Sequence, residues 1–268
     1  MTYENFKNKL NKKVFGEDLN YEIVLTVLQN PKRYIGIFRI TNAKTKLIQN
    51  VTQSCEIKFG DFMEEILGEY IIDMGYTNLN KNLGVDESNN RLSADQIFKT
   101  DKIIYLIEQK VRDDHDSTKK RGQYANLIKK IKLLKKQYPN YQIIASMWFS
   151  DESLKKNKKY YAEQIENNTD EQVIINIFYG KELFEQLFNR MDIWNEIISY
   201  LQNNKKERSR EILSVPDFDT SNEIKDALLK IKLDYPKLIE KLLSDKTEYV
   251  ELRKELFPLG HNLKELEQ

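Results

Sequence analysis

The chain has 268 residues, of which 43 are basic and 42 acidic, so its formal net charge is +1. Hydrophobic residues make up 40% of the sequence, which allows a packed core and excludes a wholly disordered chain. No apolar run approaches the ~20 residues that span a bilayer. One cysteine and two histidines exclude a disulfide framework and a Cys- or His-rich metal cluster. The lysine-rich N-terminus has no apolar signal segment, so we expect a soluble, cytoplasmic protein.

The first part of the chain combines helical and extended patterns. Residues 3–29 predict one or two helices, broken at Gly16. Residues 33–58 are expected to be extended, because they begin with a run of β-branched and aromatic side chains. Gly60 is expected to open the next helix, in which apolar residues recur at helical spacing.

A β-hairpin is predicted in the middle of the chain. Its strands are 94–99 and 102–111, joined by a tight turn at Thr100-Asp101. Alternation and helical periodicity predict, in order, a basic amphipathic helix, two apolar strands, a helix pair and a mostly helical remainder. The basic helix is expected to end at Tyr138, and the two strands to cover 142–149 and 173–178. The helix pair is expected at 183–201 and the helical remainder at 222–256.

Composition divides the chain into three parts. Residues 1–58 form an N-terminal helical and extended segment, a candidate DNA-recognition element. Residues 59–201 form the core, and residues 202–268 form a C-terminal helical segment. The polar stretch 202–210 is the best candidate for a linker.

Two charged residues interrupt the apolar second strand of the hairpin. In Glu108-Gln109-Lys110, the alternation of a strand places Glu108 and Lys110 on one face and Gln109 on the other. A two-residue turn pairs Asp95 with Leu106 and puts Asp95 on the same face as Glu108 and Lys110. A slip of one residue would turn Asp95 to the opposite face.

This arrangement suits metal-assisted phosphodiester hydrolysis. The carboxylates of Asp95 and Glu108 can bind Mg²⁺, and the backbone carbonyl of Gln109 can serve as a third oxygen ligand. Lys110 can hold or deprotonate the attacking water and offset negative charge at phosphorus. The competing interpretation is a salt bridge on the solvated face of a strand.

The tripeptide alone is a weak signal. Glu-x-Lys also occurs at 56–58 and at 223–225. The copy at 108–110 differs because it ends an apolar hairpin strand, has an aspartate on the partner strand, and precedes a basic helix.

A short strand is also expected at 78–83, before the hairpin. With it, these residues lie in the order helix, strand, strand, strand, helix, strand, and they resemble the PD-(D/E)xK nuclease superfamily over about residues 60–149. Ala94 stands where the superfamily has its nominal proline. The resemblance implies a mixed α/β (α+β) core, in which helices flank a central mixed sheet. It also implies that Asp95 and Glu108 are metal ligands and Lys110 the catalytic lysine.

Members of this superfamily often add a glutamate from the first core helix. Residues 60–65 resemble that pattern, which makes Glu64 the candidate and leaves Glu65 and Glu69 as rivals. An ordinary solvated acid on a helix is an equally good interpretation of each.

Among superfamily members, the chain is most similar to a type II restriction endonuclease, since it carries no helicase motif, Walker A sequence or zinc ribbon. The resemblance implies Mg²⁺-dependent cleavage of double-stranded DNA to 5′-phosphate and 3′-hydroxyl ends. It also implies a homodimer and a companion DNA methyltransferase. A short interrupted palindrome resembling GANTC is suspected as the recognition site, although no residue establishes it. The alternatives are a repair, recombination or structure-specific nuclease, or a non-catalytic DNA-binding protein.

Two groups of side chains are candidates for DNA contact. Residues 33–53 are rich in groups that can bond base edges, although a polar hairpin would have the same composition. The start of the basic helix offers cations for phosphates. We expect the acidic loop 113–116 to be a solvated turn or a helix cap. The candidates are Arg33, Arg39, Asn42, Lys44, Lys46, Gln49, Asn50, Gln53, Lys119, Lys120, Arg121 and Gln123.

Overall fold

The computed structural model describes residues 1–16, 18–111, 117–208 and 215–266. They divide into two compact units. We call residues Gly60–Gln202 the sheet unit, and residues Met1–Phe59 with Asn203–Gln268 the helical unit. The two terminal segments of the chain therefore belong to one unit.

The sheet unit begins within the long helix α3 (Ala43–Asp73) and ends within α6 (Met191–Glu207). Between them the chain alternates strands and helices. In order, these are β1 (Thr77–Asn78), β2 (Asn82–Val85), β3 (Arg91–Ser93), β4 (Gln96–Lys99), β5 (Ile103–Lys110), α4 (Ser117–Gln137), β6 (Gln142–Phe149), α5 (Lys158–Glu166), β7 (Val173–Tyr179) and the π-helix η2 (Leu183–Leu187).

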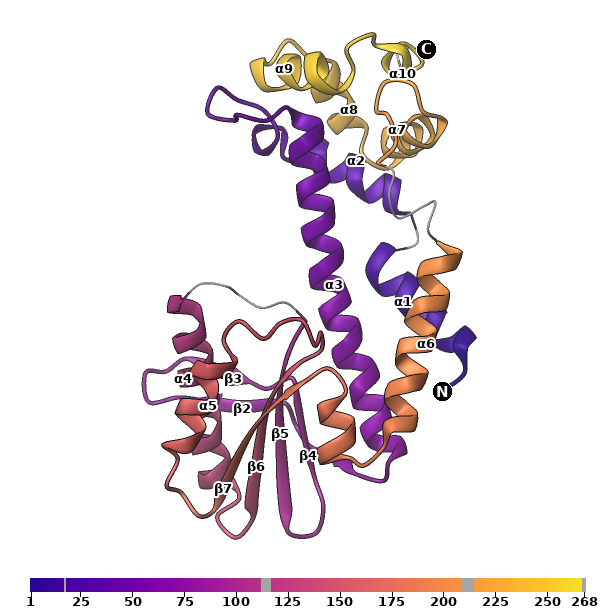
Figure 1. The fold of residues 1–268 in the computed structure, drawn as a ribbon. Coiled ribbons are helices and arrows are strands. Elements are labelled where there is room, and N and C mark those ends of the chain that lie inside the picture. The colour runs from indigo at the N-terminus through magenta and orange to yellow at the C-terminus, as the bar shows by residue number, and fades with distance from the viewer. Residues whose placement is uncertain (17, 112–116, 209–214, 267–268) are drawn as a thin grey trace. The chain divides into compact units, whose positions relative to one another are not determined.

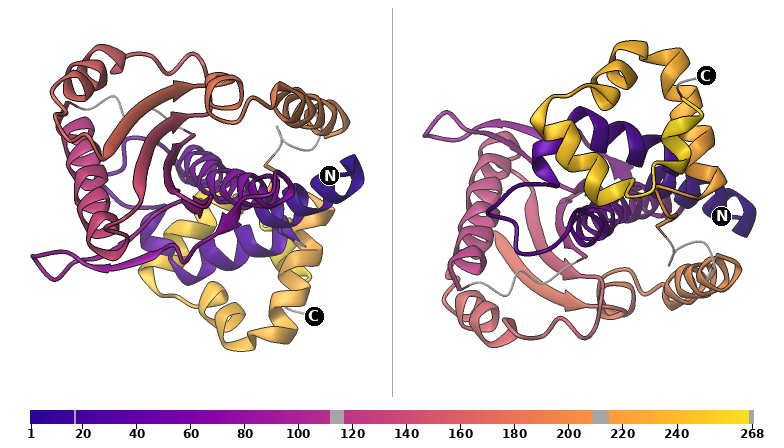
Figure 2. Two further views of the ribbon diagram at one scale, coloured as in Figure 1. Left: turned by 90° about the horizontal axis from the view of Figure 1, so that it is seen from below. Right: turned by 90° about the horizontal axis from the view of Figure 1, so that it is seen from above.

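A five-stranded mixed sheet in the order β1-β4-β5-β6-β7 forms the centre of this unit. The pairs β1/β4 and β4/β5 are antiparallel, whereas β5/β6 and β6/β7 are parallel. Helices α4 and α5 cover one face, and the second half of α3 and α6 lie on the other (Figures 1 and 2). The predicted mixed α/β core, with a central mixed sheet flanked by helices, is confirmed.

Strand β5 is held from both sides because its apolar residues are buried on both faces. Ile104 and Leu106 pack with Leu127, Ile131 and Leu134 of α4 in one hydrophobic cluster. The stripe that the sequence assigns to the basic helix is therefore the buried face of α4.

The register of the hairpin differs from the predicted one. Lys99 lies opposite Ile104, and Gln96 lies opposite Ile107, so the turn is longer than Thr100-Asp101. Relative to the prediction, the pairing moves by two residues. Because side chains alternate along a strand, an even shift keeps every residue on its predicted face.

The predicted extended segment 33–58 and a helix start at Gly60 are both wrong. Helix α3 begins at Ala43 and runs through Gly60 to Asp73. The side-chain oxygen of Asn42 accepts a hydrogen bond from the backbone N–H of Thr45 (2.9 Å), which caps the helix start. The β-branched run before Asn42 forms no strand in the described chain.

The predicted linker at 202–210 is also wrong over its described part, because α6 continues to Glu207. Its Gln, Asn, Lys and Glu side chains are polar, but none of them breaks a helix as Gly or Pro does. Asn204 is buried and donates a hydrogen bond to Asn11 (3.1 Å).

The helical unit has its own hydrophobic core, to which both ends of the chain contribute. The prediction of one or two helices over residues 3–29, broken at Gly16, is confirmed as two helices, and Gly16 between them has a φ of +71°. No helix in the described residues is long and apolar enough to cross a membrane. The further elements of this unit are α1 (Tyr3–Phe15), α2 (Leu19–Gln29), the 3₁₀ helix η1 (Pro31–Arg33), α7 (Asn222–Asp234), α8 (Pro236–Leu243), α9 (Thr247–Leu256) and α10 (His261–Lys264).

Candidate active site

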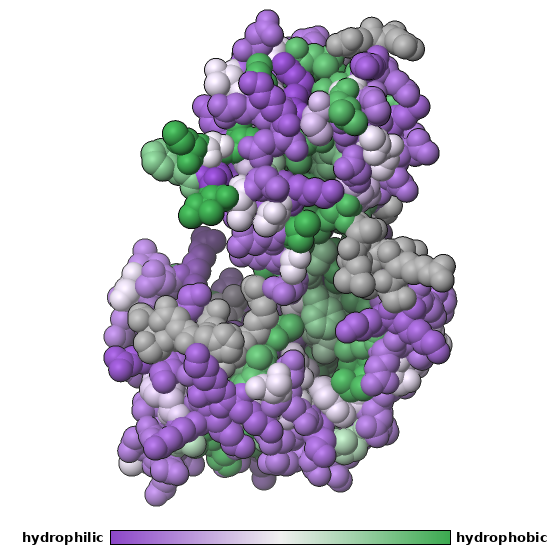
Figure 3. Space-filling model, turned by 45° about the horizontal axis from the view of Figure 1, so that its top comes forward, coloured by the Kyte–Doolittle hydropathy of each residue, from purple (hydrophilic) through white to green (hydrophobic). Residues whose placement is uncertain are grey.

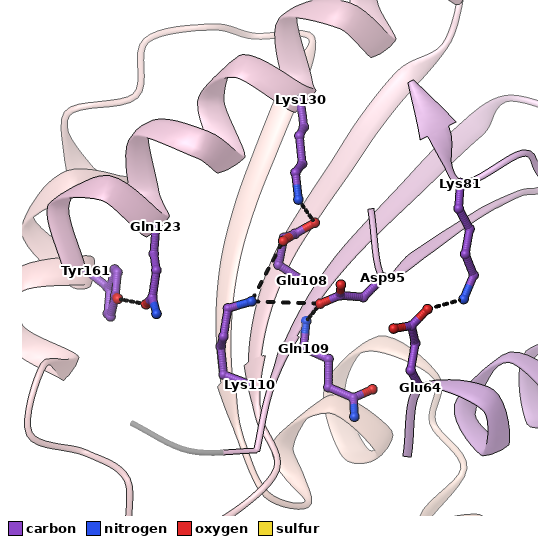
Figure 4. Close-up of polar contacts among 9 residues, drawn as sticks. All are labelled: Glu64, Lys81, Asp95, Glu108, Gln109, Lys110, Gln123, Lys130 and Tyr161. Atoms are coloured by element: carbon purple, nitrogen blue, oxygen red, sulfur yellow. Dashed lines mark hydrogen bonds and ion pairs between the residues drawn. The ribbon is translucent and has the colours of Figure 1, made fainter. Parts of the chain in front are cut away.

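Asp95, Glu108 and Lys110 meet at the open end of the β4–β5 hairpin, opposite its turn (Figure 4). The Lys110 Nζ atom lies 3.9 Å from Asp95 Oδ2 and 3.9 Å from Glu108 Oε2. The side chains of Asp95 and Lys110 are 28% and 26% exposed, whereas that of Glu108 is 8% exposed. The structure therefore brings the predicted trio together with one buried and two partly accessible groups.

Backbone hydrogen bonding fixes the position of Asp95. The N–H of Gln109 donates to Asp95 Oδ2 at 2.6 Å, which ties the residue before β4 to the end of β5. The Gln109 side chain points away from the trio (Figure 4) and is buried without a hydrogen-bond partner in the described chain. Gln109 therefore faces the site with its backbone alone.

A second lysine, which the sequence analysis missed, reaches the site from α4. The Lys130 Nζ atom lies 2.7 Å from Glu108 Oε1, and the two side chains are only 5% and 8% exposed. The sequence does hold a signal for this residue. Lys130 lies one helical turn from both Leu127 and Leu134, so it stands on the apolar face of the predicted basic helix. Buried lysines are rare unless they are paired.

Burial raises the pKa of the Glu108 carboxyl, because removing water penalises its charged form, and the nearby Asp95 adds to the effect. Lys130 and Lys110 act in the opposite direction by favouring the carboxylate. The two cations therefore compensate a negative charge that the fold withdraws from water.

Glu64 lies on α3, where the side-chain amide of Gln96 donates to its backbone carbonyl at 2.5 Å. Its carboxylate is 2.5 Å from Lys81 Nζ, on the Asp95 side of the site in Figure 4. In the described part of the chain, no three His, Cys, Asp or Glu side chains gather as a metal cluster. Glu64 is thus a neighbour of the pair Asp95 and Glu108 rather than a third member of one cluster.

The donors of this site suit a hard divalent cation. Asp95 and Glu108 offer carboxylate oxygens, and Lys130 bonds Oε1 of Glu108 while Oε2 faces Lys110. Mg²⁺ binds through one or two carboxylates and keeps several waters, so two carboxylates suffice for it. Neither cysteine nor histidine is present in the trio.

The candidate DNA contacts occur in both units. In the helical unit, Arg33 and Arg39 are exposed, while Asn42 is used as the cap of α3. Lys44 lies 3.7 Å from Asp217, and Lys46 donates to Gln49. These residues therefore lie on a loop and a helix, neither in the predicted extended segment nor in the polar hairpin that was its alternative.

The second group lies in the sheet unit at the start of α4. Lys119 and Arg121 are exposed, and Lys120 lies 4.8 Å from the centre of the Tyr160 ring. Gln123 accepts a hydrogen bond from the hydroxyl of Tyr161 at 2.8 Å. The acidic loop 113–116 lies outside the described residues.

The chain matches a known protein family over most of its length. The family model described as type II restriction endonuclease, HinfI, matches residues 2–85 and 73–205. The match covers most of the chain, including every residue of the site described above. No curated protein matches the chain.

Proposed function

The chain belongs to the HinfI family of type II restriction endonucleases, and from this premise we propose that Asp95, Glu108 and Lys110 form its Mg²⁺-dependent hydrolytic centre. Family membership makes the protein a nuclease that acts on DNA. The identity of the metal, the role of each residue and the nature of the products are the proposal.

Convergence of the three side chains is the observation that supports it. A lysine lies 3.9 Å from each of two carboxylates, at the end of a hairpin in a buried sheet. A purely structural ion pair would satisfy one carboxylate with one cation. Here Glu108 already has Lys130 at 2.7 Å, and Lys110 lies between both acids.

Each residue has a distinct part in the proposed chemistry. Asp95 and Glu108 would hold Mg²⁺, with the carbonyl of Gln109 as a further oxygen. A bound Mg²⁺ supplies Lewis-acid stabilisation of negative charge on the phosphate. Lys110 holds a water molecule, or removes its proton, and offsets the charge that develops on phosphorus. Lys130 positions Glu108 by bonding its other oxygen.

The hydrolysis adds water across one phosphodiester bond. The water oxygen attacks phosphorus in line, and the O3′ atom leaves with a proton. The products are a 5′-phosphate and a 3′-hydroxyl end. Because the described part of one chain holds one such centre, cutting both strands of a palindrome calls for a symmetric homodimer.

The surroundings of the reaction belong to the same proposal. A companion methyltransferase would protect host DNA, and both proteins would work in the cytoplasm. Glu64, whose carboxylate lies on the Asp95 side of the site, would be the further acid near a bound metal, and the exposed cations of the two units would contact phosphates.

Cleavage of unmethylated phage DNA tests this function. The purified protein is incubated with the DNA in Mg²⁺, in EDTA, and in EDTA followed by excess Mg²⁺, and the fragment ends are sequenced. We expect discrete fragments with 5′-phosphates at one short sequence, lost in EDTA and restored by Mg²⁺. Cleavage that persists in EDTA would contradict the metal, and random ends would contradict site specificity.

A further inference from the structure

An apolar tip projects from the helical unit between η1 and α3. Ile37, Phe38 and Ile40 are 93%, 98% and 102% exposed, more than any other large hydrophobic residue of the described chain. Figure 3, in which hydrophobic residues are green, shows such side chains protruding from the surface. Transferring such side chains out of water is favourable, so their exposure in the free protein calls for an explanation.

The tip is a defined turn. The N–H of Arg39 donates to the carbonyl of Gly36 at 2.9 Å, and Gly36 has a φ of +121°, which other residues rarely adopt. Before the tip, Tyr34 and Ile35 are buried, and after it Ala43 is buried. The tip is therefore held out by anchored residues on both sides.

The chain around the tip carries an excess of positive charge, although Glu255 accepts a hydrogen bond from the N–H of Ala43 and Asp217 lies 3.7 Å from Lys44. Residues 31–55 contain five lysines and arginines and no acid. In the described chain, no carboxylate pairs with Arg39, whose side chain stands between the exposed Phe38 and Ile40. A partner must therefore offer negative charge and an apolar interior side by side.

Duplex DNA has both properties, with phosphates outside and stacked bases inside. We propose that residues 36–40 are an apolar wedge that enters the DNA between base pairs, while Arg39 and its basic neighbours bind the adjacent phosphates. Side chains inserted in this way unstack a base step and bend the duplex. A second copy of the chain fits less well, because it would bring one excess of positive charge against another. The wedge rests on the proposed function only in taking DNA as the ligand.

The variant Ile37→Ser with Phe38→Ser removes the wedge without changing charge. Its matched control is Leu233→Ser with Leu259→Ser, which removes two hydrophobic residues of the same unit that are 82% and 63% exposed. Since all four side chains are exposed, both proteins should keep the wild-type melting temperature.

Two readouts in Ca²⁺, with no hydrolysis required, measure the wedge. Anisotropy on a duplex that spans a cleaved sequence should show about 10-fold weaker binding for the wedge variant, with an unchanged salt slope. A closed circular plasmid relaxed by a topoisomerase should be unwound by the wild type and the control, but not by the wedge variant. Arg39→Gln should instead lower the salt slope by about one.

Equal affinity and equal unwinding for the wedge variant and the wild type would overturn the proposal. So would a loss of self-association in sedimentation, or of binding to vesicles of phosphatidylserine and phosphatidylcholine, with unwinding intact. Neither readout requires hydrolysis, so a failure of the wedge is distinguishable from a failure of the proposed hydrolysis.

Discussion

The same tripeptide, Glu-x-Lys, lies on a strand in the sheet unit and on helices in the helical unit. On β5, Glu108 and Lys110 share a face and come within 3.9 Å of each other. In the copies on α3 and α7, the lysines instead pair with distant acids: Lys58 with Glu22 and Lys225 with Glu265. Residues two apart are neighbours on one face of a strand but not on a helix, so the secondary structure decides what the motif can do.

The largest difference among the three Glu-x-Lys copies is expected in the cleavage rate after each lysine is replaced. Lys110→Ala should lower the cleavage rate at least about 100-fold, because the negative charge that develops on phosphorus is no longer offset by a lysine. DNA binding should be retained. Lys58→Ala and Lys225→Ala are the matched controls and should cut within about 2-fold of the wild type. Timed digests in Mg²⁺ measure the rate, and a fully active Lys110→Ala protein would remove the strand copy from catalysis.

The second comparison concerns two ion pairs of one helix, the buried Lys130–Glu108 and the more exposed Lys135–Asp170. Lys130→Met should lower the free energy of unfolding by about 3–5 kcal/mol, because it leaves a buried carboxylate without its closest cation. Lys135→Met should cost about 0–1 kcal/mol.

Urea unfolding followed by tryptophan fluorescence measures both variants, since Trp148 and Trp194 lie in the sheet unit. Lys130→Arg keeps the charge and should recover part of the loss. Equal destabilisation by Lys130→Met and Lys135→Met would show that burial does not determine how much the Lys130–Glu108 pair contributes to the free energy of unfolding.

The cap of α3 tests the helical side of the comparison, because this helix carries the copy at 56–58. Asn42→Ala should lower stability by about 1 kcal/mol, since the N–H of Thr45 loses its acceptor, whereas Asn42→Ser should keep it. Thermal unfolding followed by circular dichroism is the measurement. A Ser variant that is stable but binds DNA weakly would show that Asn42 also contacts DNA.

The smallest effect is expected at Asp170, where Lys135 holds the pKa of the carboxyl below its usual range. This group stabilises the fold above its ordinary pKa of about 3.9, and the contribution disappears as the pH falls through the lowered value. Asp170→Asn should therefore melt about 2 °C lower than the wild type at pH 7, and the difference should shrink as the pH falls below the ordinary pKa of an aspartate. A difference that grows on acidification would contradict this assignment.

Local sequence patterns were enough to predict much of the fold and the three residues at the centre of the site. Strand 142–149 is β6 with the same bounds, and the apolar stripe of the basic helix is the face that packs on the sheet. Asp95, Glu108 and Lys110 could be placed together because alternation is a property of the strand itself and does not depend on distant contacts.

The failures have physical causes. The run of β-branched and aromatic residues at 34–41 has strand propensity, but it pairs with no strand in the described chain. Tyr34 and Ile35 are buried, whereas Ile37, Phe38 and Ile40 stay exposed. Lys130 could be seen on an apolar stripe, yet its partner Glu108 is 22 residues away, and only the packing of α4 on β5 joins them. In both places the outcome depends on tertiary contacts that the local sequence does not show.

The alternating faces of the β4–β5 hairpin have a consequence for insertions and deletions in its turn. One added or lost residue before Ile103 would rotate Asp95 out of reach of Lys110, whereas a change of two would return it to the same side. Active descendants of this chain should accordingly vary the length of that turn by even numbers of residues. An odd change should survive only where a β-bulge absorbs the extra residue.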